Sequence, residues 1–305
     1  MALSYAIIGT GGIGGYYGGR LAHIGCDVHF LFHSDYEFVK QHGLQVDSVN
    51  GNILLPTPQA YHRTQDMPKC DVIFVSMKTV NNHLLKDMLM PILHEHSVVV
   101  LVQNGLGMEE NLSHEIPRTS IVGATAFICT TKVGPGHVHH AEYGTLTIAP
   151  YNECDINVLQ QVVADFEKAA VSVNLGDDLL SIRWKKLVWN IPYNGLTVVL
   201  NAATNELTFN KDSRQIIIDL MTEVVEAGRC CGAKISDTFI SKMIGMTEKM
   251  TPYSPSMRLD YEAKRPMEIE TMYSNPIAIA KAHGYRMSKT EILEKQLRFI
   301  AATMY

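Results

Sequence analysis

The feature that most constrains the fold is a glycine-rich turn near the N-terminus. Residues 5–8 read as a short buried strand, and the next six residues follow the spacing G-x-G-x-x-G before a helical pattern begins. In this context the first glycine permits a tight turn, the second lets the backbone approach a diphosphate, and the third lets the helix pack closely on the strand. A second strand at 28–32 completes the pattern of a dinucleotide-binding unit. The residues expected to hold the cofactor are Gly9, Thr10, Gly11, Gly12, Ile13 and Gly14.

The end of the second strand bears on the choice between the two nicotinamide cofactors. An NAD-binding chain usually places a carboxylate there to accept from the ribose hydroxyls, whereas this chain has His33 and Ser34. Asp35 lies slightly beyond, where it could rotate toward the ribose or cap the next helix. We therefore expect NADPH, with His33 as a partner of the 2′-phosphate that is charged in part of its population near neutral pH. Dual specificity stays open.

Two further buried strands deliver polar residues at their carboxyl ends. The strand at 70–76 ends near Lys78, and the strand at 97–102 ends at Gln103, Asn104 and Gly105. In a doubly wound sheet ligands bind at this edge, so Lys78 and Asn104 are candidate ligand-binding residues. The alternative is ordinary loop chemistry, because Asn-Gly is a favoured turn pair and a lysine after a strand is often solvated.

The periodicity changes near residue 176. Before it, a strand at 119–127, a hairpin through 134–136, a helix at 158–170 and a strand at 171–175 continue the α/β pattern, and after it the pattern is helical almost throughout. The predicted fold class is α/β, with an N-terminal doubly wound sheet of Rossmann type in residues 1–176. An all-helical domain for substrate binding and catalysis is predicted for residues 177–305.

An apolar helical segment in the second half carries three polar side chains at steps of four: Lys186, Asn190 and Asn194. Steps of four lie on one helix face, and a few convergent polar groups in an apolar lining are what a substrate pocket needs. The alternative is structural, with the ammonium of Lys186 in water and the two asparagines bridging turns. Pro192 is expected to kink the helix between the two asparagines.

Composition and charge narrow the class of partner. The 305 residues are 46% hydrophobic and 19% charged, with a formal net charge of −5, which disfavours nucleic acid and anionic membranes. The chain lacks a transmembrane-length apolar run, and residues 1–4 lead directly into the first strand, so we expect a cytoplasmic protein. His137, His139 and His140 follow a Gly-Pro-Gly turn without a helical i, i+4 pair, and we expect no metal there.

Two residues further along complete the candidate set. Ser256 is a plausible N-cap, and Glu268 falls in the first turn of a predicted helix that starts after Arg265. An acidic residue in that position suits the helix dipole, so capping electrostatics alone would explain it.

Taken together, these motifs resemble the ketopantoate reductase (2-dehydropantoate 2-reductase) family over essentially the whole chain. The markers that carry the resemblance are the glycine motif at 9–14, Lys78, Gln103-Asn104-Gly105, Trp184-Lys185-Lys186-Leu187 with Asn190 and Asn194, Ser256-Met257, and Glu268. The family implies NADPH-dependent reduction of 2-dehydropantoate to pantoate, a step of pantothenate and coenzyme A biosynthesis.

The resemblance also implies roles for individual residues. Lys186 corresponds to the lysine that stabilises the developing charge on the keto oxygen and donates its proton, and Glu268 to the carboxylate that orients it and contacts the cofactor. Asn190 and Asn194 would bind substrate oxygens, Ser256 would hold the carboxylate, and Asn104 would contact both substrate and cofactor ribose. Lys78 would approach the cofactor, and Ile128 stands at a cofactor position.

This chain departs from the family pattern at several positions, which leaves alternatives open. His33 replaces a frequent arginine, Thr204 replaces an asparagine, and Phe127 and Ile128 replace more usual residues. The alternatives are a reductase of another small 2-keto acid, a hydroxyacid dehydrogenase related to 6-phosphogluconate dehydrogenase, and a non-catalytic NADPH sensor. The apolar helices of the second domain could also support a homodimer.

Overall fold

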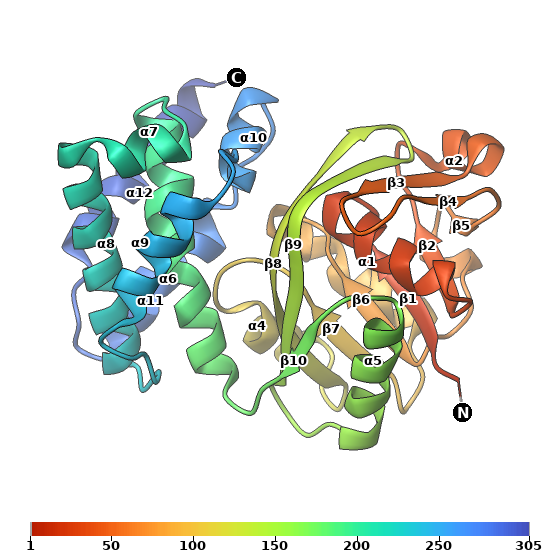
Figure 1. Cartoon of the computed structure of the whole chain (residues 1–305). Helices are drawn as coiled ribbons and strands as arrows, with labels where there is room; N and C mark the ends of the chain where they lie inside the picture. Colours follow the sequence, from red (N-terminus) through yellow and green to blue (C-terminus); the bar gives the residue numbers. More distant parts are fainter. Residues whose placement is uncertain (1, 305) are drawn as a thin grey trace. The chain divides into compact units, whose positions relative to one another are not determined.

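A mixed sheet forms the framework of the N-terminal part of the computed structural model, which describes residues 2–304 (Figure 1). Its elements are β1 (Ser4–Ile8), α1 (Gly12–His23), β2 (Asp27–Leu31), α2 (Tyr36–His42), β3 (Leu44–Ser48), β4 (Ile53–Leu55), β5 (Gln59–Tyr61), η1 (Thr64–Asp66), β6 (Val72–Val75), η2 (Thr79–Leu84), α3 (Leu85–Leu89), η3 (Met90–Ile92), β7 (Val98–Leu101), α4 (Met108–Glu115), β8 (Ser120–Gly134), β9 (His137–Pro150), α5 (Ile156–Lys168) and β10 (Val173–Leu175).

The strand order explains why the glycine turn can be a binding site. Strands β5, β2, β1, β6, β7 and β8 are neighbours in that order, and each adjacent pair is parallel. Strands β2 and β5 therefore lie on one side of β1, and β6, β7 and β8, which come later in the chain, lie on its other side. This is the doubly wound order, in which the crevice at the carboxyl end of the first strand is open to a ligand. The predicted fold class is confirmed.

A long hairpin extends the sheet beyond this parallel core. Strand β8 pairs antiparallel with β9, which in turn pairs in parallel with β3 and β10, and β4 closes the edge against β3. The sequence pattern predicted the β8–β9 hairpin but did not identify β3, β4 and β5, which are short.

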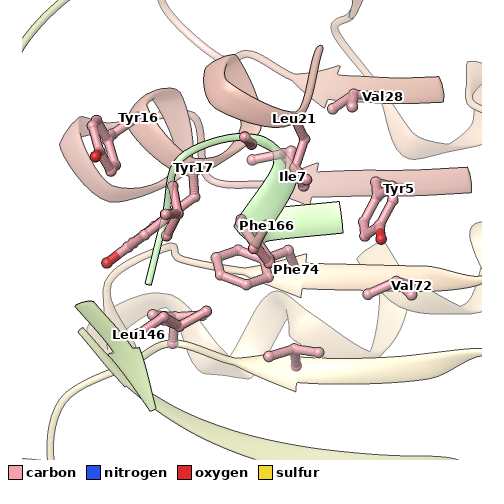
Figure 2. Packing of buried hydrophobic residues seen from close by; sticks show 14 of the residues in the cluster. Tyr5, Ile7, Tyr16, Tyr17, Leu21, Val28, Val72, Phe74, Leu146 and Phe166 are labelled. Atoms are coloured by element: carbon pink, nitrogen blue, oxygen red, sulfur yellow. The ribbon is translucent and has the colours of Figure 1, made fainter. Parts of the chain in front are cut away.

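Apolar side chains cover both faces of the sheet. On one face α1 and α5 pack over the strands, and Figure 2 shows Tyr17 of α1 and Phe166 of α5 meeting Phe74 of β6. Their rings lie 5.8 to 5.9 Å apart, within the range of favourable aromatic contacts. On the other face, Leu89 of α3 and Leu112 of α4 belong to a second buried cluster.

Helices make up the remainder of the chain, and a third apolar cluster holds them together. They are α6 (Leu179–Val199), α7 (Thr204–Phe209), α8 (Lys211–Cys230), α9 (Phe239–Lys249), α10 (Ser256–Glu262), the π-helix η4 (Glu270–Ser274), α11 (Asn275–Ala282) and α12 (Ser288–Thr303). Gly228 of α8 lies against the Trp184 ring of α6, where an added Cβ would come within 3.1 Å of the ring. Among residues 2–304, no helix has both the length and the apolarity that crossing a bilayer requires.

The chain divides into two units. The first comprises Met1–Gln103 and Met108–Leu179, and the second comprises Asn104–Gly107 and Leu180–Tyr305. The sequence pattern placed a boundary between 176 and 177 and assigned Asn104 to the first domain, whereas the segment Asn104–Gly107 groups with the helices.

Candidate functional site

The first group of candidate residues is the turn between β1 and α1. Gly9 has a φ of +96°, and a Cβ there would lie 2.4 Å from the backbone nitrogen of Met77. A Cβ at Gly14 would lie 2.5 Å from the Gly9 carbonyl oxygen. Gly11 differs, because a Cβ at this position would meet nothing within 4 Å. Gly9 and Gly14 are therefore required by the fold, while Gly11 borders open space.

The helix that follows this turn begins with uncapped backbone. Gly11 is the N-cap of α1 and, lacking a side chain, makes no capping hydrogen bond. Thr10 Oγ1 donates to the Leu31 carbonyl at 2.9 Å and so ties the turn to the end of β2. Ser76 Oγ donates to the Gly9 carbonyl at 2.8 Å from the end of β6. A fixed turn, open space at Gly11 and a helix N-terminus together fit the diphosphate of a dinucleotide cofactor.

The end of β2 carries an imidazole, as the sequence indicates, and the fold adds a second one. His33 is exposed, and its ring lies 6.2 Å from that of His62, with an interplanar angle of 23°. His62 directly follows β5, the parallel neighbour of β2. Sequence reasoning missed His62 because a three-residue strand gives almost no periodic signal.

Asp35 is the N-cap residue of α2, but its side chain makes no capping hydrogen bond. Its carboxylate accepts from Lys132 Nζ at 2.6 Å and from the Gly136 N–H at 3.0 Å, at the tip of the β8–β9 hairpin. Burial opposes ionisation of this carboxyl, but the hydrogen bonds and the charge of Lys132 outweigh it and lower the pKa of Asp35. Asp35 is thus an ionised residue that holds the hairpin tip.

Two other predicted cofactor residues, Lys78 and Ile128, lie in this unit. Lys78 is half-buried and directly precedes η2 at the end of β6. Gln103, buried at the end of β7, donates to the Met77 carbonyl at 2.9 Å and to Asn82 Oδ1 at 2.6 Å, and so fixes the segment that carries Lys78. Ile128 is half-buried on β8 and packs against the core of the α1 face.

The polar stripe of α6 forms the second group of candidate residues. Lys186 is half-buried, whereas Asn190 and Asn194 are 3% and 2% exposed. The helix continues through Pro192, where a kink is expected, and Tyr273 Oη donates to the neighbouring Ile191 carbonyl at 2.9 Å. The three side chains therefore stay on one continuous helix.

Each asparagine of the stripe contacts another predicted site residue. Asn190 Nδ2 donates to Asn104 Oδ1 at 3.3 Å, and Asn194 Oδ1 accepts from the Met257 N–H at 3.0 Å and from Ser256 Oγ at 3.4 Å. Ser256 is the first residue of α10 and not its N-cap, which is Pro255. The fold thus brings Asn104, Asn190, Asn194 and Ser256 together in pairs, although they are far apart in sequence.

Glu268 lies in the same helical unit and is 3% exposed. It directly precedes the helical segment that starts at Ile269, and its carbonyl oxygen accepts from the Met272 N–H at 3.3 Å. A buried carboxylate needs partners, and its position just before a helix is favourable for a negative charge.

The histidines of β9 lie on alternate faces of the strand. His137 Nε2 is 2.7 Å from Asp47 Oδ2, His139 is exposed, and His140 is fully buried. Burial lowers the pKa of His140, although hydrogen bonds to the Tyr143 and Glu142 carbonyls act in the opposite direction. Within residues 2–304, no group of three or more potential ligands is arranged to hold a metal ion.

A glycine cradle on a doubly wound sheet, joined to a helical unit with a Lys-Asn-Asn stripe, defines the class of two-domain, nicotinamide-dependent oxidoreductases. Residues 5–153 match the family described as ketopantoate reductase PanE/ApbA, and residues 178–301 match its C-terminal counterpart. The chain belongs to the ketopantoate reductase family.

Individual relatives agree with this assignment. The chain is similar to a 2-dehydropantoate 2-reductase of Nostoc sp., with 46% identity over 97% of this chain and 94% of the relative. It is also similar to the crystal structure of 2-dehydropantoate 2-reductase from Geobacter metallireducens, with a TM-score of 0.93, 35% identity and coverage of 97% and 99% of the two chains. A D-mandelate dehydrogenase structure with NADH and anilino(oxo)acetate shares the fold, with a TM-score of 0.88 at 17% identity over 99% of both chains.

Proposed function

We propose that this protein catalyses the NADPH-dependent reduction of 2-dehydropantoate to pantoate, a step toward pantothenate and coenzyme A. The observation that carries the proposal is the stripe of α6, whose two buried asparagines pair with Asn104 and with Ser256 next to a half-buried lysine. A small keto acid needs this combination: one cation for the keto oxygen and several neutral donors for carboxylate and hydroxyl oxygens. The printed names of the Nostoc and Geobacter relatives support the same reaction.

The proposed roles in the helical unit follow from the chemistry of carbonyl reduction. The chemistry that NADPH would supply when bound is transfer of a hydride to the keto carbon. Negative charge then develops on the keto oxygen, where the Lys186 ammonium stabilises it and donates a proton. Asn190 and Asn194 donate amide hydrogen bonds to substrate oxygens, and Ser256 holds the carboxylate. Glu268 orients the Lys186 ammonium and binds a ribose or substrate hydroxyl.

The proposed cofactor residues lie mainly in the sheet unit. The backbone of residues 9–14 would hold the diphosphate, with Gly11 allowing its close approach. Lys78, Ile128, Asn104 and Glu268 complete the proposed set. This assignment rests on the open space at Gly11 and on the position of each residue in the family pattern.

The preference for NADPH is supported by what surrounds the end of β2. His33 and His62 present two imidazoles there, and the Asp35 carboxylate is paired with the Lys132 ammonium and accepts from the Gly136 N–H. A phosphate gains from imidazolium partners and is repelled by an unpaired carboxylate. We therefore propose that both histidines face the 2′-phosphate.

A homodimer is the proposed assembly. Helix α12 exposes Ile292 and Phe299, which are 60% and 70% exposed, and these side chains would be buried by a second copy. A dimer mass in sedimentation that falls to the monomer mass in Phe299→Glu is the expected result.

One assay tests the function. Purified protein is followed by oxidation of NADPH or NADH with 2-dehydropantoate, 2-ketoisovalerate, pyruvate and an aryl 2-keto acid. We expect the highest kcat/KM for 2-dehydropantoate with NADPH. A higher value for the aryl acid would move the protein toward the mandelate dehydrogenases that share its fold, and oxidation of neither cofactor would refute the proposal.

A further inference from the structure

We propose that Asn275 positions Asn104 for the substrate by anchoring the segment Asn104–Gly107 on the helical unit. This inference rests on the proposed function, which assigns Asn104 to substrate binding. Asn275 is the first residue of α11. It lies far along the sequence from the segment that it would hold, and no motif points to it.

The anchor consists of two hydrogen bonds to the same residue. Asn275 Nδ2 donates to the Leu106 carbonyl at 2.8 Å, and the Leu106 N–H donates to the Thr271 carbonyl at 2.9 Å. Both backbone polar groups of Leu106 are therefore bonded to the helical unit. Its side chain is 5% exposed and belongs to the apolar core of the helices. The segment is thus held by polar and apolar contacts together.

The π-helix explains why the Thr271 carbonyl accepts from outside its own helix. In η4 the Asn275 N–H donates five residues back, to the Glu270 carbonyl. The same pattern would pair the Thr271 carbonyl with residue 276, which is a proline and has no N–H. Pro276 therefore leaves this carbonyl to a donor from another segment, and Leu106 supplies that donor.

Two glycines adapt the segment to this surface. Gly105 has a φ of +106°, and a Cβ there would lie 2.2 Å from the Thr271 carbonyl oxygen. Gly107 has a φ of +93°, and its Cβ would lie 3.0 Å from Asn275 Nδ2. Any other residue at position 105 would push the segment off the π-helix.

The consequence for Asn104 follows from its neighbours in the chain. Its Oδ1 accepts from Asn190 on α6, while the side chain of the preceding Gln103 is bonded to Met77 and Asn82 in the sheet unit. The peptide between Gln103 and Asn104 therefore links a side chain held by the sheet unit to a side chain held by the helical unit. Without Asn275, displacement of Asn104 is opposed by the contact with Asn190, at 3.3 Å, by the Leu106–Thr271 bond and by burial of the Leu106 side chain.

A double-mutant cycle on catalysis tests the positioning role. Asn275→Ala is expected to lower kcat/KM for 2-dehydropantoate about ten-fold, because small displacements of binding groups cost catalysis heavily. In the Asn104→Ala background the same substitution should change kcat/KM less than two-fold, since its effect passes through Asn104. An equal loss in both backgrounds would overturn the inference.

Two further variants separate positioning from folding. Ser213→Ala removes a comparable hydrogen bond, from Ser213 Oγ to the Leu207 carbonyl at 2.7 Å, and should lower Tm without changing kcat/KM. Asn275→Asp keeps the shape of the side chain and suits a helix start, but it replaces the donor by an acceptor. It should therefore lower kcat/KM as much as is expected for Asn275→Ala, and it provides the test if the alanine variant does not fold. Full activity of a folded Asn275→Asp protein would also overturn the inference.

Hydrogen exchange distinguishes failure of this inference from failure of the proposed function. Faster exchange at Leu106 in Asn275→Asp than in wild type is expected, and this readout needs no substrate. If wild type reduces no keto acid, the proposed function fails, and unchanged exchange at Leu106 would show separately that Asn275 is not the anchor.

Discussion

The two units prepare binding in different ways. In the sheet unit the proposed cofactor site is mostly backbone: a turn with a required glycine at each end, open space at Gly11 and an uncapped helix start. In the helical unit the proposed substrate site consists of side chains, with Asn190 and Asn194 buried and each hydrogen-bonded to a second site residue. Atoms added to a backbone site should weaken ligand binding there, whereas a side-chain site should lose binding or turnover when atoms are removed. Substitutions in the two units test that difference.

The largest effect is expected for Lys186→Ala. Removing the cation that stabilises the keto oxygen should lower kcat roughly 10²- to 10⁴-fold, with NADPH binding changed little. Steady-state kinetics and fluorescence titration of NADPH measure the two quantities. Lys185→Ala is the matched control, because Lys185 is an equally half-buried lysine on the same helix. A similar loss in both variants would assign the effect to the helix and not to Lys186.

The next effect is expected for Gly11→Ala. Its Cβ meets nothing within 4 Å, so the fold should tolerate it, but the added methyl group would occupy the space proposed for the diphosphate. We expect Kd for NADPH to rise at least about ten-fold with Tm unchanged.

Two other glycines serve as controls for that variant. Gly245→Ala on α9 also meets nothing within 4 Å and should leave Kd unaltered and raise Tm slightly, because alanine favours a helix interior, while Gly14→Ala should destabilise the fold by on the order of 2 kcal/mol through overpacking. If Gly11→Ala binds NADPH normally, the diphosphate lies elsewhere.

A smaller effect is expected at the two imidazoles. His62→Ala should weaken NADPH binding about three- to ten-fold and leave NADH binding unchanged, while His33→Arg should tighten NADPH binding because arginine is always charged and binds phosphate through two donors. The ratio of Kd values for the two cofactors measures this. His114→Ala, an exposed histidine of α4, should not change the ratio. Equal weakening of both cofactors by His62→Ala would place His62 away from the 2′-phosphate.

The smallest effect concerns stability and lies outside both sites. Because burial lowers the pKa of His140 below its ordinary value of 6.5, the folded state disfavours the proton that the unfolded state accepts. Its contribution to stability is complete above pH 6.5 and is lost as the pH falls through the lowered pKa. Chemical denaturation at pH 7.5 and 5.5 should therefore show a smaller loss of stability in His140→Gln than in wild type. His139→Gln is the control, because His139 is exposed. An equal loss of stability between pH 7.5 and 5.5 in His140→Gln, His139→Gln and wild type would contradict a role of His140.

Local sequence is sufficient to predict the strands and helices whose apolar residues follow a regular pattern. The buried strands that became β1, β6 and β7 are mainly apolar runs, and α8 has a clear helical period, so neither kind of element needs tertiary information. The π-helix was not predictable in this way. The sequence pattern predicts an ordinary helix that starts after Arg265, whereas the structure has a π-helix at Glu270–Ser274, in which the Thr271 carbonyl accepts from Leu106, a residue remote in sequence.

The proposed site residues divide in the same way. Lys186, Asn190 and Asn194 can be proposed from the sequence because helix spacing alone places them on one face. His62 and Asn275 cannot, because their partners His33 and Leu106 become neighbours only through strand pairing and helix docking. The ion pair of Asp35 with Lys132 is not predictable from local sequence either, because the two residues are far apart in the chain.

Sequence by itself determined the class of this protein: a glycine turn between strand and helix and a polar stripe on an apolar helix are local features, fixed by backbone conformation and helix period. Tertiary structure alone decided which unit holds Asn104. The segment Asn104–Gly107 groups with the helices, and its Leu106 hydrogen-bonds with residues that come more than 150 positions later in the chain. Such a choice depends on burial of Leu106 and on its hydrogen bonds with Thr271 and Asn275, and these interactions form only once distant segments have met.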